Sequence, residues 1–370
     1  MIDMRIYLFA SHVLLATNKD YASRIRDGVA EAIQKALPLL SYLSSKADIT
    51  VVADSEASVP VMLSECCEVR LFDEISDLYD FTESQPPALA IFWNGGDYSS
   101  HVYETWVRSF GGESLYLEYG FYSQGGHVRL DVGGVLSAAD LPDKMMYAMI
   151  DDGEVAQYLA SVRVAVDKAS YPPGKKPLLV LQTDHDSSVV LGSAFPRSID
   201  FVRFLKESAF NFEECVVRFH PKMPKSSVDE LMIVFGDGVT VDSSANPMES
   251  LRRHDLFIGV NSTLLYEAAL LGKRVVNFGA MYGGRLLGVP GRQFLSQDFD
   301  WSQWQADALQ RDRFIYFCHR YRQFSIADGL NELNRRYVDE ALLSIEARSR
   351  RRLAPSLIAG HDALVNRPVS

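Results

Sequence analysis

Short apolar segments recur along this chain, and each is followed at once by polar or turn-forming residues. Leu178-Leu179-Val180-Leu181 precedes a polar stretch at 182–188, Val216-Val217 precedes another at 218–222, and Leu256-Phe257-Ile258 precedes a third at 261–263. Uninterrupted apolar runs this short are typical of strands buried on both faces, and segments of helical periodicity separate them. This alternation predicts parallel α/β sheets.

The same alternation extends over both halves of the chain. In the first half we expect strands at 5–10, 49–53, 69–72, 88–93 and 114–117, and a helix from Asp20 to Leu40; the segment 128–131 and a Gly-Gly turn come after this pattern. In the second half we expect strands near 178–182, 215–219, 239–242, 256–260 and 274–278. Beyond Gly279 we expect a long glycine-rich loop and then two helices, at 301–323 and 327–350.

The length of the chain and a proline-rich break within it predict two domains. A chain of 370 residues exceeds one ordinary domain, and the proline-rich segment 171–177 breaks it sharply. We therefore expect an N-terminal Rossmann-like domain at 1–150, a bridging helix and linker at 151–177, a C-terminal Rossmann-like domain at 178–300, and helices with a tail at 301–370. The predicted fold class is α/β, with two doubly wound domains.

Charge and cysteine content narrow the function classes. The net charge of -11 argues against wholesale nucleic-acid binding, although a local basic groove for an anionic ligand stays open. The four cysteines show no metal-ligand spacing, which favours a reducing, cytoplasmic compartment. No apolar stretch approaches the ~20 residues of a membrane span. The basic cluster at 348–352 is interpreted as a solvated helix end or as a contact with an anionic membrane surface.

The polar segment after the strand at 178–181 contains the strongest candidate site, because ligands of open α/β sheets bind outside the carboxyl ends of strands. Asp184 and Asp186 have the spacing of an Asp-x-Asp metal site, but two carboxylates are too few ligands to hold a metal alone. Alternatively, Asp186 or Ser187 caps the next helix, or Asp186 is an activated carboxylate beside an anomeric carbon. We favour the last interpretation for Asp186 and predict no metal site.

Two further strand ends of the second half supply cationic and hydroxyl groups. Arg218, His220 and Lys222 surround a proline that ends the strand, and we interpret this cluster as an anion contact. Ser262 and Thr263 begin an apolar helix, where free N–H groups bind phosphate or where the hydroxyl simply caps the helix. In the first half, Glu118 ends a strand and is either a turn residue or a general acid/base facing a cleft.

These segments occur in the order of a known family. Glu118-Tyr119-Gly120-Phe121, Gln182 to Ser188, Arg218-x-His220-Pro221, and Asn261-Ser262-Thr263 leading to Lys273-Arg274-Val275 resemble the motifs of the capsule polysaccharide biosynthesis group that contains the retaining β-Kdo (keto-deoxy-octulosonate) transferases. The likeness spans roughly residues 110–280. Tyr119 stands where that group has an aspartate, so only Glu118 of its acidic pair is carried over. The Asp-x-Ser pattern selects Asp186 over Asp184.

The resemblance implies a bilobal, GT-B-like transferase that moves β-Kdo from CMP-Kdo to a glycan or glycolipid acceptor in capsule or lipopolysaccharide biosynthesis. It implies Asp186 as nucleophile, Glu118 as acid/base and His220 as a further catalytic group, with no cofactor and no nucleic-acid partner. The acceptor would bind mainly to the N-terminal domain, and the enzyme would be cytoplasmic with a peripheral contact to the inner membrane. The implied donor-binding residues are Gln182, Asp184, Ser187, Ser188, Arg218, Pro221, Lys222, Asn261, Ser262, Thr263 and Glu267.

Two other functions stay open at this stage. One is a transferase of the same fold that uses another nucleotide sugar, such as CMP-sialic acid or a UDP-hexose. The other is a non-catalytic module of a capsule-assembly complex, and the joint presence of Glu118, Asp186 and His220 argues against it.

Overall fold

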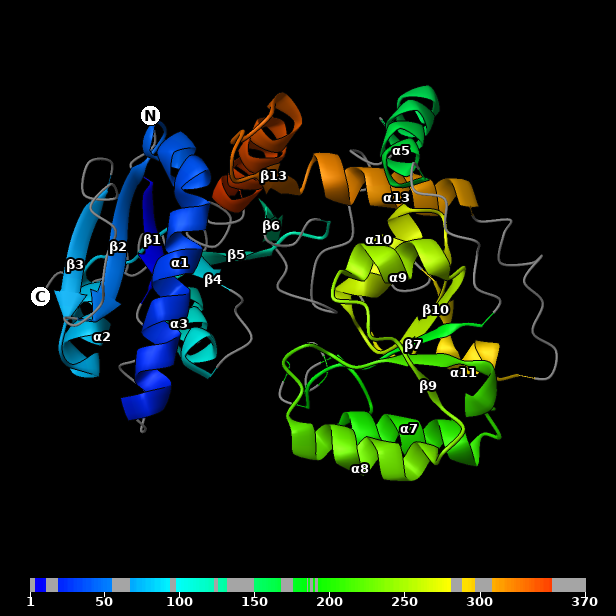
Figure 1. The fold of residues 1–370 in the computed structure, drawn as a ribbon. Coiled ribbons are helices and arrows are strands. Elements are labelled where there is room, and N and C mark those ends of the chain that lie inside the picture. Colours follow the sequence, from blue (N-terminus) through cyan, green and yellow to red (C-terminus); the bar gives the residue numbers. More distant parts are fainter. Residues whose placement is uncertain are drawn as a thin grey trace, which may run out of the picture. The chain divides into compact units, whose positions relative to one another are not determined.

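The computed structural model describes residues 4–10, 19–54, 67–93, 98–122, 126–131, 150–167, 176–184, 186, 189, 192–280, 288–296 and 308–347. Contacts group the chain into two units, which are described one at a time (Figure 1). Unit 1 comprises Met1–Val135 together with Tyr321–Ser370, and unit 2 comprises Leu136–Arg320. The chain from Tyr321 onward is thus grouped with the first half of the sequence.

The described residues of unit 1 form a seven-stranded sheet in the order β13-β6-β5-β4-β1-β2-β3. The pairs from β3 to β5 are parallel, whereas β6 is antiparallel to β5 and β13 is antiparallel to β6. Strand β6 is antiparallel to β5 because the short connection between them leaves no room for a parallel crossover. The strands are β1 (Arg5–Phe9), β2 (Asp48–Asp54), β3 (Glu68–Phe72), β4 (Leu89–Trp93), β5 (Glu113–Tyr119), β6 (His127–Asp131) and β13 (Gln323–Ser325).

Alternate residues of the central strands in unit 1 are buried on opposite faces of the sheet. Tyr7 and Phe9 of β1 pack in one core cluster with Leu78 of α2 (Ile75–Ser84) and Tyr103 of α3 (Tyr98–Ser109). Ile6 and Leu8, which point to the other face, are buried as well. The long helix α1 (Lys19–Ser44) contacts β2, β4 and β6. Burial on both faces explains why these strands are uninterrupted apolar runs in the sequence.

The described residues of unit 2 form a six-stranded sheet in the order β12-β11-β10-β7-β8-β9, and every pair is parallel. The predicted parallel strands of the second half are therefore confirmed. Residues 289–290, which we expected in a loop, pair with β11 as an edge strand. The strands are β7 (Leu178–Val180), β8 (Val216–Arg218), β9 (Thr240–Val241), β10 (Leu256–Gly259), β11 (Arg274–Asn277) and β12 (Val289–Pro290).

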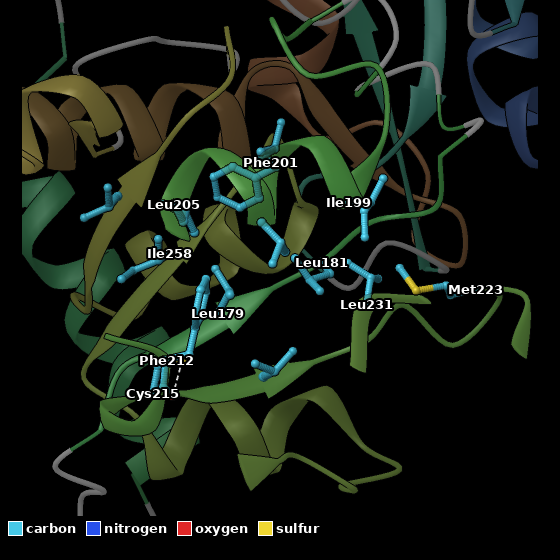
Figure 2. Close-up of a cluster of buried hydrophobic side chains, with 14 of the residues drawn as sticks. Leu179, Leu181, Ile199, Phe201, Leu205, Phe212, Cys215, Met223, Leu231 and Ile258 are labelled. Carbon is cyan, nitrogen blue, oxygen red and sulfur yellow. Dashed lines mark hydrogen bonds between the residues drawn. The ribbon is translucent and has the colours of Figure 1, made fainter. Parts of the chain in front are cut away.

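The main core of unit 2 lies between this sheet and α7 (Ser198–Glu207) with α8 (Lys225–Phe235). Figure 2 shows Leu179, Leu181 and Ile258 from the sheet against Phe201 and Leu205 of α7. Helices α9 (Pro247–Arg253) and α10 (Thr263–Leu270) lie on the other side of the sheet (Figure 1). Helix α5 (Asp152–Asp167) contacts α13 (Ala308–Arg320), which in turn contacts α10, and α11 (Gly291–Phe294) follows β12.

The C-terminal segment differs from the two helices that we predicted at 301–323 and 327–350. In the described part, α13 ends at Arg320, and β13 then pairs with β6 instead of continuing the helix. The second helix is described over residues 332–347. It begins there because Asn331 Oδ1 accepts a hydrogen bond from the backbone N–H of Asn334 at 2.9 Å. Among the described residues, no helix is long and apolar enough to cross a membrane.

Candidate active site

The three polar strand ends of unit 2 meet at one edge of its sheet. Strands β10, β7 and β8 are neighbours and parallel, so their carboxyl ends point the same way. Gln182 follows β7, His220 follows β8 and Asn261 follows β10. Parallel sheets bind ligands at this edge. The structure therefore brings together the segments that the sequence selected.

Asp184 caps a helix of unit 2. Its Oδ1 accepts a hydrogen bond from the backbone N–H of Ser198, the first residue of α7, at 2.8 Å. The Ser198 hydroxyl donates to the carbonyl oxygen of Gln182 at 2.5 Å. One carboxylate oxygen of Asp184 thus fixes the start of α7 against the end of β7. The sequence analysis considered Asp186 and Ser187, and not Asp184, as helix caps.

Asp186 and His220 interact electrostatically at the ends of β7 and β8. Burial lowers the pKa of His220, the Asp186 carboxylate raises it, and Lys222 lowers it; the net shift is downward, so the ring is neutral at pH 7. Its Nδ1 accepts the backbone N–H of Lys222 at 3.1 Å. The proton of the neutral ring is therefore on Nε2, which leaves that nitrogen as a hydrogen-bond donor. Pro221 and Lys222 are exposed beside it.

Arg218 is buried and bonded within the protein. Its Nη1 contacts Asp242 Oδ2 at 2.8 Å, the carbonyl oxygen of Ser244 at 2.9 Å and the hydroxyl of Ser250 at 3.0 Å. Burial of Asp242 opposes ionisation, but hydrogen bonds from Ser250, Ser244 and Arg218 outweigh it and lower the pKa of Asp242 to about 2. The guanidinium therefore ties β8 to the residues after β9 and to α9.

The β10–α10 turn combines a capped helix with a fixed left-handed residue. Ser262 is the N-cap of α10, and its hydroxyl accepts the backbone N–H of Leu264 at 3.3 Å. Asn261 has a φ of 49° and is held by its neighbours, since its Nδ2 donates to the carbonyl oxygen of Gly192 at 2.7 Å. Its own N–H donates to Asn277 Oδ1 at 2.9 Å. Asn261 thus shapes the turn, while Thr263 follows as the first residue of the helix.

Glu267 lies one turn after Thr263 on the same face of α10. Both residues are half-buried, whereas the other side chains of this helix are buried. Burial raises the pKa of Glu267 to about 7, with no other cause contributing. Among the described residues, the Glu267 carboxyl makes no hydrogen bond or ion pair. A carboxyl desolvated without a compensating partner is a common feature of functional sites.

Glu118 lies in unit 1, near the carboxyl end of β5. Its Oε1 accepts the backbone N–H of Tyr119 at 3.2 Å, and its Oε2 is 3.6 Å from Arg129 Nη2. Arg129 is the directly opposite residue on β6. The carboxylate is therefore part of a cross-strand ion pair that is mostly shielded from solvent.

Several candidates are placed differently from what the sequence suggested, and some useful residues were missed. Ser187 and Ser188 lie outside the described residues. The described residues include no group of three or more potential metal ligands. Sequence reasoning missed Asp242, Asn277 and Gln323, which hold Arg218, Asn261 and the turn after Glu118. An aspartate or asparagine at the end of a neighbouring strand was a signal for the first two, whereas nothing local marked Gln323.

Comparisons with known proteins give a fold and no family assignment. No protein-family model matches the chain, and no curated protein matches it. Among solved structures, KpsC of Thermosulfurimonas dismutans, described as a β-Kdo 2,7 transferase, is similar over 94% of this chain and 99% of that chain, with a TM-score of 0.53 and 12% identity. The same organism's KpsC β-Kdo 2,4 transferase covers 85% and 91%, with a TM-score of 0.46 and 15% identity.

A glycosyltransferase from Rickettsia africae covers 94% of this chain and 99% of that chain, with a TM-score of 0.41 and 9% identity. Only the first of these matches exceeds a TM-score of 0.5, and at 12% identity it shows a shared fold. The fold is α/β with two Rossmann-like domains and is GT-B-like, as the sequence predicted.

Proposed function

We propose that this protein is a glycosyltransferase that uses a nucleotide sugar, with CMP-Kdo as the donor. The observation that carries the proposal is that Asp186 and His220, whose pKa burial lowers, interact electrostatically at the sheet edge where α10 begins. This edge is where parallel sheets bind ligands, and a carboxylate beside a phosphate-binding group suits transfer from a sugar phosphate. The GT-B-like fold and the ordered sequence motifs support the same reading.

The donor phosphate would be held by neutral and positive groups of unit 2. His220 would donate its Nε2 proton to a phosphate oxygen, and the first turn of α10 after Ser262 would present backbone N–H groups and the positive end of the helix dipole. Glu267 would accept hydrogen bonds from the ribose hydroxyls of CMP. Lys222 is exposed and can approach the Kdo carboxylate, whereas Arg218 is withdrawn from this role by its contacts with Asp242, Ser244 and Ser250.

If the product retains its configuration, as the resemblance implies, Asp186 would act as the nucleophile. The carboxylate would attack the anomeric carbon of Kdo while the bond to the CMP phosphate breaks and its electron pair leaves with the phosphate oxygen. An acceptor hydroxyl would then attack the same carbon, Glu118 would take the hydroxyl proton, and Asp186 would leave as a carboxylate. The acceptor is a glycan or glycolipid, bound mainly by unit 1.

Substitution of Asp186 by Asn tests this role. The change keeps the size of the side chain but removes its charge, so transfer should fall by roughly 10²–10⁴-fold or more, while CMP binding measured by calorimetry is retained. Intact-mass spectrometry of the wild type given CMP-Kdo without acceptor should show an adduct of Kdo mass that fragments to Asp186. Full activity of Asp186→Asn, or an adduct on Asp184, would refute the assignment.

Donor specificity is tested separately from the mechanism. Transfer from CMP-sialic acid or from a UDP-hexose, with none from CMP-Kdo, would keep the enzyme class and change the donor. Absence of binding to CMP, to CMP-Kdo and to UDP-sugars would instead favour a non-catalytic module of a capsule-assembly complex.

A further inference from the structure

The C-terminal strand β13 makes side-chain contacts with the turn that carries Glu118. Gln323 is 2% exposed, and its Oε1 accepts the backbone N–H of Phe121 at 2.5 Å and that of Tyr122 at 3.1 Å. Its Nε2 donates to the carbonyl oxygen of Tyr122 at 3.3 Å. One buried amide therefore satisfies three backbone groups of a turn that is about 200 residues away in the sequence.

Gly120 provides the space for this contact. A Cβ atom on Gly120 would lie 2.8 Å from Gln323 Oε1 and 2.5 Å from the Cβ of His127. Both distances are shorter than side chains allow, so a larger residue would push the turn away from β13 and β6. The glycine of the segment Glu118-Tyr119-Gly120-Phe121 is thus explained by the close approach of Gln323.

The Gln323 side chain lies on the same side of the sheet as the Glu118 carboxylate. Glu118 is directly opposite Arg129 on β6, and Arg129 is directly opposite Gln323 on β13. Directly opposite residues of antiparallel strands project to the same face, so these side chains form one row across three strands. At one end of the row Glu118 pairs with Arg129, and at the other end Gln323 bonds the turn that continues from Glu118.

Asn334 holds the strand that carries Gln323. Asn334 donates its Nδ2 hydrogens to the carbonyl oxygens of Gln323 at 2.9 Å and of Tyr321 at 3.0 Å, and it is fully buried. Asn334 lies in the helix over residues 332–347, so that helix holds β13 in place. The turn at 120–122 is therefore anchored to two elements from the far end of the chain.

We propose that Gln323 is a positioning residue that fixes the Glu118 carboxylate for deprotonation of the acceptor hydroxyl. This inference rests on the proposed function, in which Glu118 is the base. A general base must lie within hydrogen-bond reach of the proton it removes, and a displacement of about 1 Å can cost roughly 10²-fold in rate. Gln323 acts on Glu118 through the turn at 120–122.

Three variants of the full-length protein test the inference. Gln323→Met removes all three hydrogen bonds while keeping an unbranched side chain of similar length. Gln323→Glu keeps an oxygen that accepts from Phe121 and Tyr122 but loses the amide donor. Phe324→Leu is the matched control, because this buried neighbour on the same strand points to the opposite face of the sheet.

We expect kcat for transfer to fall by roughly 10–100-fold in Gln323→Met, with a smaller loss in Gln323→Glu. The dissociation constant for CMP should stay unchanged in both, since the donor site belongs to unit 2. Amide hydrogen exchange should show loss of protection at Phe121 and Tyr122 in Gln323→Met. Phe324→Leu should lower Tm by about as much as Gln323→Met does, while leaving kcat close to that of the wild type.

The outcomes separate this inference from the proposed function. An active wild type with unchanged kcat in Gln323→Met would overturn the inference alone. Equal losses of kcat in Gln323→Met and Phe324→Leu would also overturn it, because the effect would then follow general destabilisation. A wild type that transfers sugar from no nucleotide donor would overturn the proposed function, and the inference with it.

Discussion

The carboxyl of Glu267 offers a sharp test of how burial at the candidate donor site affects both stability and binding. Burial raises its pKa from an ordinary value of 4.5 to about 7. Between these pH values the folded protein holds a proton that the unfolded chain has released, so ionisation in the folded state is penalised. Each unit of pKa shift corresponds to about 1.36 kcal/mol. The free energy of unfolding should therefore fall by about 3 kcal/mol between pH 4.5 and pH 7 because of this group alone.

Glu267→Gln removes this pH dependence while keeping the shape of the side chain. Relative to the wild type, the variant should gain about 3 kcal/mol of stability as the pH rises from 4.5 to above 7, and most of the gain should appear below the folded-state pKa. Urea unfolding at a series of pH values, followed by circular dichroism, measures the difference. Because the two units can unfold separately, the comparison uses the transition that responds to the substitution.

The affinity for CMP should rise with pH over the range in which the stability falls. The ionised carboxylate is the better acceptor for ribose hydroxyls, so the affinity of the wild type for CMP should increase as the pH rises through about 7. In Glu267→Gln the affinity should be lower at pH 8, and this pH dependence should disappear. Parallel stability curves for the two proteins would refute the burial argument. Equal CMP affinities at pH 8 would refute the contact with the nucleotide.

Three further results are expected. His220→Ala should weaken CMP binding by roughly 10–100-fold in calorimetry without lowering Tm, because it removes a hydrogen bond to a charged phosphate, and equal affinities would exclude that contact. Incubation with a chelator should leave transfer intact, whereas loss of transfer that Mg²⁺ or Mn²⁺ restores would reinstate the metal reading of Asp184 and Asp186. Asp242→Asn should destabilise the protein by about 2 kcal/mol at pH 7, since the pKa of Asp242 is lowered to about 2. The difference in stability between variant and wild type should vanish as the pH falls from 4 towards 2. Urea midpoints that differ equally at pH 7 and at pH 2.5 would contradict this.

Much of the fold could be predicted because burial on both faces leaves a direct trace in the sequence. The central strands β7, β8 and β10 of unit 2 contain uninterrupted apolar runs, and their residues are buried in the core. The edges of both sheets were harder to predict, because an edge strand is short and its pairing depends on a distant segment. Gln323-Phe324-Ser325 lies where the sequence predicts the end of one helix and the break before the next, and its pairing with the distant β6 makes it a strand.

The candidate site, like the fold, could be predicted from the sequence only in part. The sequence placed Asp186, His220 and Ser262 at strand ends, and parallel pairing of β10, β7 and β8 brings those ends to one edge. It selected Asp186 over Asp184 only through the resemblance to a family pattern, and it did not distinguish Arg218 from Lys222, because both are cations near the same strand end. The difference is made by long-range partners: Ser198 takes up Asp184, and Asp242 takes up Arg218.

By itself, the sequence determined which segments are buried strands and which polar residues follow them, because hydrophobic periodicity and strand ends are local properties of the chain. Only the tertiary structure decided which protein partners Asp184 and Arg218 take up. It also decided that β13 and Gln323 support the turn after Glu118. These contacts join residues that are distant in the sequence, and no local pattern encodes the partner.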